Sequence, residues 1–298
     1  MRLSKAFLRT ATRWAVKPFL GPPWPFAFQR AWLRLVASVN APSKEAGREW
    51  VEMGSVRAMV ARPRGEPPTH SILYMHGGGY CIGGPSTHLG LVTHLAVAAR
   101  ASVYVPDYRL APEHPYPAAL EDGLRTYRWM LDHGWSPGRI AIAGDSAGGG
   151  LALTTALAIR DEALPHPAAI VLISPWTDLG CDSPSRTANA RIDPMIRTSW
   201  SKRCAAVYLD GRATDDPACS PLFADHRNLP PLLVQVGTDE VLIDDATALA
   251  DRCRDAGVDV TLQVFDGMWH VFQSSVGAMT EADDAVAKIA GFLRSHWS

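Results

Sequence analysis

The stretch RIAIAGDSAGGGLALTTALAI (residues 139–159) decides the fold. Its opening RIAIA is typical of a strand buried on both faces, and the closing GGLALTTALAI predicts a helix. The intervening GDSAG (144–148) needs a sharp turn, because Gly144 and Gly148 let two backbone segments approach closely. Such a turn lifts Ser146 into the open, in front of a helix N-terminus, and this predicts a nucleophile. The motif alone also leaves open a glycine-rich turn with an idle serine.

Further apolar runs alternate with helical stretches from about residue 50 onward. Strands are predicted at 71–76, 101–108, 139–146, 169–176, 231–240 and 260–267, with helices at 87–99, 118–133, 148–161, 244–256 and 281–296. This alternation indicates an α/β fold with a mostly parallel, doubly wound sheet flanked by helices. Residues 49–63 alternate more strongly in polarity and predict an antiparallel edge pair.

Composition narrows the classes of protein. The 298 residues include 47% hydrophobic residues and carry a formal net charge of −1, so nucleic acid is not an expected partner. The five cysteines show no metal-ligand spacing, which favours free thiols in a reducing compartment. Basic residues interrupt the N-terminal segment every four residues, so neither a signal peptide nor a stable membrane insertion is expected. We therefore expect a cytoplasmic protein.

Two segments fall outside the α/β pattern and predict a cap. Residues 1–20 are typical of an amphipathic helix with a basic stripe, and 26–39 of a second, aromatic-rich helix. The first could lie on a membrane surface or pack as a lid, and its aromatic content favours the lid. A long connection follows residue 176. We expect the helices of 1–45 and the insertion 178–225 to form the cap over a catalytic domain of residues 46–298.

The glycine-rich segment HGGGY (76–80) follows the predicted strand 71–76 and suggests an oxyanion hole. Glycines allow the loop backbone to approach a substrate closely. We expect the N–H groups of Gly77, Gly78 and Ala147 to face a developing oxyanion. His76 is interpreted as a support for this loop.

A nucleophilic serine needs a general base and an acid that orients the base. Where the serine lies on such a strand-to-helix turn, the three residues follow one another in the order Ser, acid, His, so both partners are expected after Ser146. His270 follows the predicted strand 260–267 and is the expected general base. Asp239 stands at the end of strand 231–240 and is the expected orienting acid, with Glu240 and Asp244 as rivals.

The pairing of HGGG with GDSAGG resembles the hormone-sensitive-lipase-like esterases, as do YRLAPEHPYPAALED (108–122), SPWTDL (174–179), DEVLIDD (239–245) and GMWH (267–270). The resemblance implies an eight-stranded core with a helical cap, and hydrolysis of short- to medium-chain acyl esters without cofactor or metal. It implies a small-molecule ester substrate and leaves room for a homodimer. Amide or lipid hydrolysis by the same triad, and ligand binding without turnover, remain alternatives.

Aromatic side chains near these motifs are candidates for the substrate pocket, because small-molecule pockets are mostly apolar. We expect Tyr80 and Trp269 from the catalytic domain, and Trp14 and Phe19 from the cap, to line it.

Overall fold

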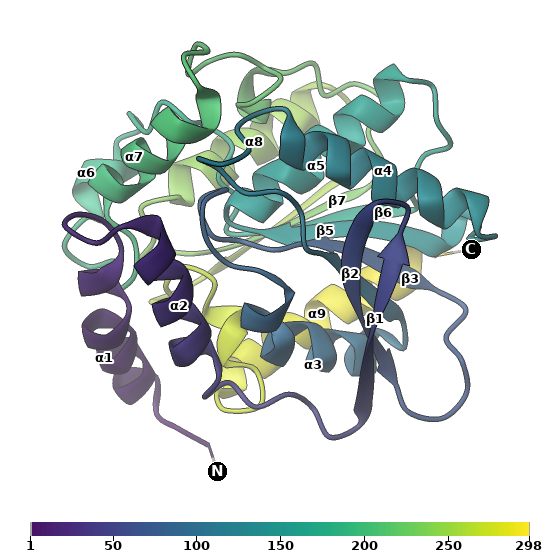
Figure 1. The fold of residues 1–298 in the computed structure, drawn as a ribbon, viewed down its shortest axis with the longest axis horizontal. Coiled ribbons are helices and arrows are strands. Elements are labelled where there is room, and N and C mark those ends of the chain that lie inside the picture. The colour runs from purple at the N-terminus through teal and green to yellow at the C-terminus, as the bar shows by residue number, and fades with distance from the viewer. Residues whose placement is uncertain (1, 298) are drawn as a thin grey trace.

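An eight-stranded sheet forms the centre of the computed structural model, which describes residues 2–297 (Figure 1). Residues 1 and 298, the outer ends of the predicted ranges 1–45 and 46–298, lie outside the described part. The strand order is β1-β2-β4-β3-β5-β6-β7-β8, with β1, β2 and β4 paired antiparallel and the remaining neighbours parallel. The strands are β1 (Ala46–Met53), β2 (Val56–Pro63), β3 (Ser71–Met75), β4 (Ser102–Pro106), β5 (Ile140–Asp145), β6 (Ala169–Ile173), β7 (Leu232–Gly237) and β8 (Val260–Phe265).

Helices cover both faces of the sheet, as the sequence predicts for a doubly wound fold. In Figure 1, α3 and α9 lie on one face and α4, α5 and α8 on the other. Their bounds are α3 (Leu89–Ala99), α4 (Ala118–Asp132), α5 (Ala147–Asp161), α8 (Ile243–Asp255) and α9 (Thr280–His296). The predicted α/β architecture and the antiparallel edge pair are therefore confirmed.

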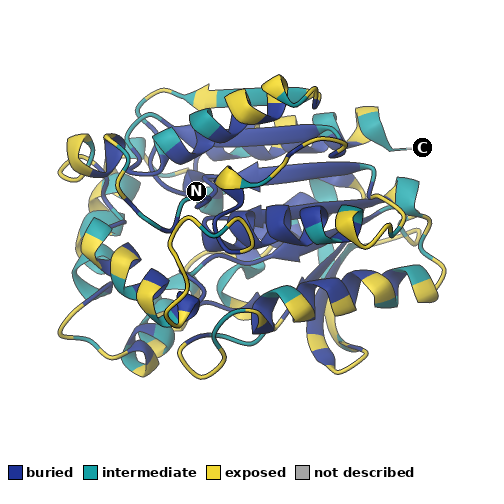
Figure 2. Ribbon diagram, turned by 90° about the horizontal axis from the view of Figure 1, so that it is seen from above, coloured by how far each residue is buried: buried dark blue, intermediate teal, exposed yellow. Residues whose placement is uncertain are grey.

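The burial pattern explains why these runs form strands. Every residue of β3, β4, β5, β6 and β7 is buried, while the edge strand β8 is not. Figure 2 shows the central strands dark blue beneath helices whose outward faces are exposed. Strands enclosed on both faces need apolar side chains at every position, so they read as continuous apolar runs.

The remaining helices gather at one end of the sheet (Figure 1). They comprise α1 (Lys5–Ala15), the short 3₁₀ helix η1 (Lys17–Phe19) and α2 (Phe26–Ala37) from the N-terminus, with α6 (Ser185–Ala188) and α7 (Thr198–Leu209) from the long connection. The basic stripe of α1 faces the protein. Arg9 and Arg13 donate to the carbonyl oxygen of Ile192, and Lys17 donates to that of Asp193. These contacts tie α1 to the connection between β6 and β7.

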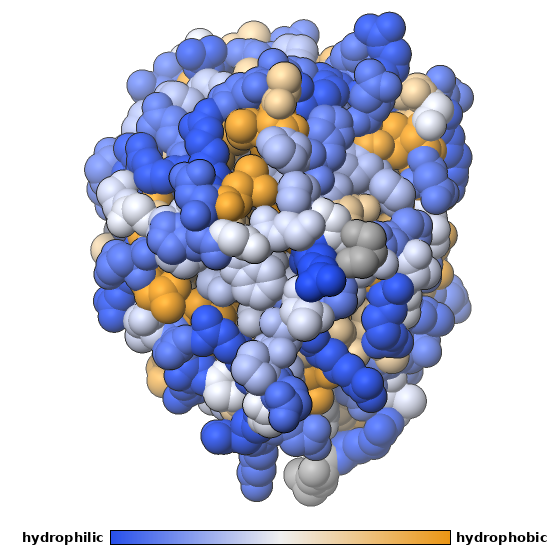
Figure 3. Space-filling view, turned by 90° about the vertical axis from the view of Figure 1, so that its right-hand side faces the viewer, coloured by the Kyte–Doolittle hydropathy of each residue, from blue (hydrophilic) through white to orange (hydrophobic). Residues whose placement is uncertain are grey.

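No helix within residues 2–297 is both long and apolar enough to cross a bilayer. The face opposite α1 and α2 shows small, separate apolar patches among polar side chains (Figure 3). Such scattered patches are usual on the surfaces of monomers.

Candidate active site

The loops that follow β3, β5, β6 and β8 meet at one edge of the sheet and line a cavity beneath α1 and α2. The loop after β7 contacts this site through Glu240. Parallel strands bring their carboxyl ends to a common edge, so residues far apart in the sequence become neighbours there.

Ser146 sits at the tight turn between β5 and α5, with φ 55° and ψ −125°. This backbone conformation is strained for a residue with a side chain and is found mainly at functional sites. A Cβ atom at Gly144 would lie 2.2 Å from the carbonyl oxygen of Gly148, and one at Gly148 would lie 2.1 Å from that of Met75. The two glycines of GDSAG are therefore required by the close approach of three backbone segments.

His270 follows β8 and is paired with Glu240, which follows β7. His270 Nδ1 lies 3.0 Å from Glu240 Oε2, and both side chains are buried. Glu240 Oε1 accepts hydrogen bonds from Ser174 Oγ at 2.7 Å and from the Gly237 N–H at 2.6 Å. These donors fix the carboxylate, and the carboxylate fixes the ring and its tautomer, with Nδ1 protonated and Nε2 available as a base.

The prediction of Asp239 as the partner of His270 is wrong in this geometry. Asp239 Oδ2 instead accepts a hydrogen bond of 2.5 Å from Arg9 Nη1 of α1, and its side chain stays partly exposed. Strand β7 ends at Gly237, so residues 239 and 240 lie in the turn that follows it. Adjacent side chains point in different directions there, and the longer Glu240 points inward to the histidine. The rival Asp244 accepts a hydrogen bond from the Ser185 N–H.

The pKa of His270 is raised above its ordinary value. Burial alone would lower it, but the hydrogen bond and charge of Glu240, with smaller effects of Asp193 and Asp145, outweigh burial. The ring is thus a stronger base than a free histidine.

Ser146 and His270 line the same cavity. Within residues 2–297 no hydrogen bond joins the two side chains. Catalytic hydrogen bonds are often long in unliganded enzymes and shorten when substrate binds.

The loop after β3 supplies backbone N–H groups next to Ser146. For the chain as described, the N–H groups of Gly78, Gly79 and Ala147 have no hydrogen-bond acceptor, which leaves them free for a ligand. Gly77 differs, because its N–H already lies 3.1 Å from Asp145 Oδ1. The prediction for Gly77 as an oxyanion donor is therefore wrong, and Gly79, which the sequence analysis missed, is the better candidate beside Gly78 and Ala147.

His76 supports this loop from below. Its Nδ1 lies 2.9 Å from the Gly77 carbonyl oxygen, and its ring stacks on Tyr108 with 4.1 Å between centroids. Burial, and next the neighbouring His88, lower the pKa of His76 to about 3. A neutral, fully buried ring at this place fits its interpretation as a structural support.

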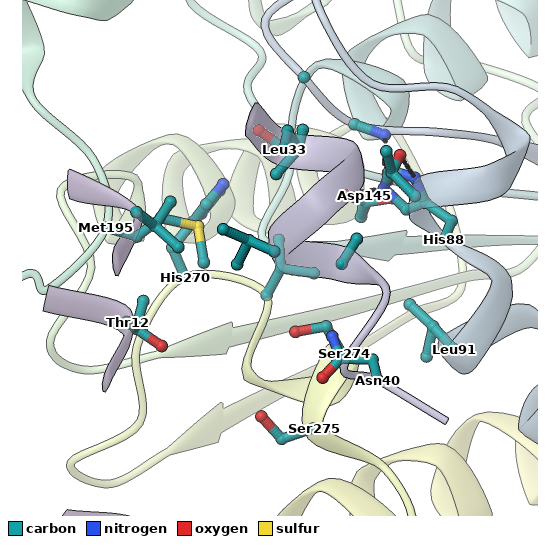
Figure 4. A pocket seen from close by; sticks show the side chains of 18 of the residues that line it. Thr12, Leu33, Asn40, His88, Leu91, Asp145, Met195, His270, Ser274 and Ser275 are labelled. Atoms are coloured by element: carbon teal, nitrogen blue, oxygen red, sulfur yellow. Dashed lines mark hydrogen bonds and ion pairs between the residues drawn. The ribbon is translucent and has the colours of Figure 1, made fainter. Parts of the chain in front are cut away.

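The cavity holds about 250 Å³ and is mainly apolar. His270 and Met195 lie on one side of it, Asp145 and His88 on the other, and Thr12, Asn40, Ser274 and Ser275 along a third (Figure 4). Aliphatic side chains supply most of the remaining wall, namely Leu8, Ala11, Ala15, Val16, Leu20, Leu33, Val36, Ala37, Val39, Ile82, Leu91, Ile196 and Val271.

None of the four predicted pocket aromatics lines this cavity. Tyr80 is buried and stacks on Tyr208 at 3.8 Å, and Trp269 is buried in a separate cluster. The ring of Phe19 is tilted against that of Trp32 with 4.3 Å between centroids, whereas Trp14 is 72% exposed on the outer side of α1. The other three rings fill the space between elements. The cavity is instead lined by aliphatic residues and by the aromatic Trp200 of α7, which the sequence analysis missed.

The connection between β6 and β7 holds the loop that carries Glu240. Asn189 Nδ2 donates to the carbonyl oxygen of Glu240 at 2.8 Å, and the buried Asp193 accepts from the Val241 N–H at 3.0 Å. Arg9 completes this contact from α1. The helices over the pocket and the loop of the acid therefore form one connected unit.

Within residues 2–297, no three His, Cys, Asp or Glu side chains are grouped so that they could hold a metal ion. The cavity brings together the Ser146 hydroxyl, the His270 imidazole with its carboxylate, and unpaired backbone N–H groups.

A serine at a strand–helix turn, with a His–Glu pair from later strands, defines an α/β-hydrolase. A family model described as alpha/beta hydrolase fold matches residues 72–274. An acetyl-hydrolase of Streptomyces hygroscopicus is 41% identical over 245 residues, which cover 82% of either chain. A putative acetyl-hydrolase, LipR, of Mycobacterium tuberculosis is 36% identical over 297 residues, covering 99% of this chain and 96% of that one.

The comparison with solved structures leads to the same family. A crystal structure of an esterase from the bacterial hormone-sensitive lipase family matches with a TM-score of 0.95 and 39% identity, over 100% of both chains. The chain belongs to the α/β-hydrolase family, among the esterases like hormone-sensitive lipase, and is a carboxylic-ester hydrolase.

Proposed function

We propose that the chain is a serine carboxylesterase that works through an acyl-enzyme, with Ser146 as nucleophile, His270 as base and Glu240 as orienting acid. The observation that carries this proposal is the buried Glu240–His270 pair beside the strained Ser146 turn in one cavity. Serine is a weak nucleophile until a neighbouring base accepts its proton.

In the first half-reaction, Ser146 Oγ attacks the ester carbonyl carbon while His270 Nε2 accepts the hydroxyl proton. The carbonyl oxygen becomes an anion that the N–H groups of Gly78, Gly79 and Ala147 stabilise. The C–O bond to the alcohol then breaks, and His270 returns the proton to the leaving alcohol. In the second half-reaction, water attacks the acyl carbon while His270 accepts its proton. The bond to Ser146 Oγ then breaks, His270 returns the proton to Ser146, and the carboxylic acid leaves.

The walls of the cavity favour a short to medium acyl chain. The space of about 250 Å³ is bounded on the cap side by α1 and α2, which contribute Ala11, Ala15 and Ala37. Transfer of each methylene from water into such a wall contributes about 0.8 kcal/mol. Affinity should therefore grow with chain length until the cavity is full.

We expect Ala15→Phe to shorten the acyl chain that the enzyme prefers, because the ring occupies space next to Val16 and Leu33. The value of kcat/KM for p-nitrophenyl octanoate should fall at least about tenfold, the worth of roughly two buried methylenes, while the acetate changes little. The matched control is Ala6→Phe on the exposed side of the same helix, outside the pocket lining. An equal loss on both esters would show that α1 does not bound the acyl site.

The pH dependence follows from the raised pKa of His270. The ring must be neutral to accept a proton, so kcat/KM rises with pH through this pKa, with its midpoint above the ordinary value of about 6.5. Glu240→Gln removes the hydrogen-bonded charge that raises the pKa, so its residual activity should rise at lower pH. Initial rates from pH 5 to 9 measure both midpoints, and an unshifted midpoint in the variant contradicts the assigned cause.

We further infer that α1, η1, α2 and the insertion 178–225 act as a cap over a catalytic domain of residues 46–298. The carbonyl contacts of Arg9, Arg13 and Lys17 support this division.

The edge strand β8 supports a homodimer, in which two such edges would pair. Light scattering tests the dimer, and a mass near 32.3 kDa contradicts it. The five free, buried thiols support a cytoplasmic location, which cell fractionation tests.

A further inference from the structure

A second buried carboxylate lies directly beside the nucleophile. Asp145 immediately precedes Ser146, lines the same cavity and is 3% exposed. Its Oδ1 accepts hydrogen bonds from Tyr74 OH at 2.8 Å and from the Gly77 N–H at 3.1 Å. The proposed triad does not use this carboxylate.

His88, which precedes α3, is the neighbour of this carboxylate. Nε2 of His88 lies 3.2 Å and 3.3 Å from the two oxygens of Asp145, and Figure 4 shows the two side chains together at the wall of the pocket. On the other side of the ring, Nδ1 faces the Gly84 carbonyl oxygen at 3.2 Å and Thr87 Oγ1 at 2.9 Å.

A proton on both ring nitrogens satisfies these partners. Thr87 Oγ1 lies 2.7 Å from the Gly84 carbonyl oxygen, and when it donates its proton there, Nδ1 faces two accepting oxygens. Nε2 faces a carboxylate, which also accepts only. Gly77 N–H lies 3.2 Å from Nε2 as well, but it has Asp145 as its acceptor.

Other groups around the ring keep this charge state. His76 has its centroid 5.5 Å away and is neutral, and Tyr74 at 6.3 Å gives its proton to Asp145. Burial alone would lower the pKa of His88, but the charge and hydrogen bond of Asp145 raise it above the ordinary value. Burial would raise the pKa of Asp145, yet His88, and next Tyr74, lower it.

A bare carboxylate at this place would oppose the reaction. The tetrahedral intermediate carries a negative charge in the cavity that Asp145 lines, and like charges in a buried site repel strongly. The same carboxylate cannot simply be omitted, because it holds the Gly77 N–H at the start of the oxyanion loop.

We propose that His88 is held as an imidazolium that neutralises Asp145, and that the pair positions the oxyanion loop without placing a net negative charge beside the oxyanion. His88 is thus a positioning residue of the esterase reaction, and this inference rests on the proposed function.

Four variants test the pair with p-nitrophenyl butyrate: His88→Gln, Asp145→Asn, the double variant, and His94→Gln as the matched control. His94 also directs Nδ1 to a carbonyl oxygen four residues earlier but lies outside the pocket lining. Because Asp145 also raises the pKa of His270, kcat is taken at the pH plateau of each variant.

We expect His88→Gln to lower kcat about 100-fold or more, with KM within about threefold, because an unpaired carboxylate near the oxyanion costs roughly as much as a lost oxyanion donor. Adding Asp145→Asn should restore kcat about tenfold over His88→Gln. Asparagine removes the charge but keeps an oxygen for Gly77 and Tyr74. His94→Gln should stay within twofold.

A double variant no faster than His88→Gln would overturn the proposal, since purely structural losses do not compensate each other. A second measurement leaves His88 and Asp145 unchanged, so it does not depend on how the variants at these two positions fold. In histidine-labelled Ser146→Ala protein, nitrogen NMR should find both nitrogens of His88 protonated at pH 7.5, and a neutral ring would also overturn the proposal. Full activity of Ser146→Ala itself would refute the proposed function instead, and leave the charge state of His88 as measured.

Discussion

Replacing Ser146 with alanine should lower kcat/KM for p-nitrophenyl butyrate by roughly 10⁴- to 10⁶-fold, because the alanine side chain cannot form the acyl-enzyme. The rest of the site is retained in the variant, including the Glu240–His270 pair and the free N–H groups. Binding of substrate should therefore survive while turnover is lost.

The control for this prediction is Ser275→Ala, which removes another hydroxyl from the pocket lining. Its activity should stay within about fivefold of the wild type, the effect of one ordinary hydrogen bond. A fluorophosphonate should label the wild type and Ser275→Ala but not Ser146→Ala. If Ser146→Ala kept more than a hundredth of the activity, another nucleophile would have to be sought.

The second large effect is expected at Glu240. Glutamine has the same shape but cannot stabilise the imidazolium or fix the tautomer of His270, and comparable changes of a triad acid cost about 10⁴-fold in kcat. We expect Glu240→Gln to lower kcat by about 10³- to 10⁴-fold.

Asp239→Asn is the matched variant, one residue away on the same loop. It removes the ion pair with Arg9 but leaves the hydrogen bond to His270 intact, so kcat should stay within about tenfold. Equal losses in the two variants would mean that the geometry of this loop does not identify the acid.

The sequence predicts the fold well because periodicity and strand context are local properties. The buried runs became β3 to β7, and the GDSAG segment lies between β5 and α5 as expected. Ser146 and His270 could be located because the fold fixes the order of the strands that carry them.

The choice between Asp239 and Glu240 could not be made in this way. It depends on how the chain turns after Gly237, and therefore on contacts with Asn189 and Asp193, which come from a distant segment. The role of Gly77 was misjudged for the same reason, since its N–H is taken by Asp145 only in the folded chain.

The pocket was the least predictable part. Three of the four predicted aromatic residues pack between elements, and aliphatic residues of α1 and α2 form much of the wall together with Trp200 of α7. Small aliphatic residues carry no distinctive signal in a sequence. His88 likewise has no recognisable motif and gains meaning only next to Asp145.

Asp239 and Glu240 stand side by side but serve different partners: one anchors the N-terminal helix and the other steadies the imidazole. Because the two residues are adjacent, we expect a displacement of α1 that moves Asp239 also to disturb Glu240 and the imidazole that it holds. Displacement of α1 should therefore lower the turnover rate as well as weaken substrate binding. Removal of residues 1–20 should lower kcat and raise KM together. A change in KM alone would mean that the Asp239–Arg9 contact and the Glu240–His270 contact act independently.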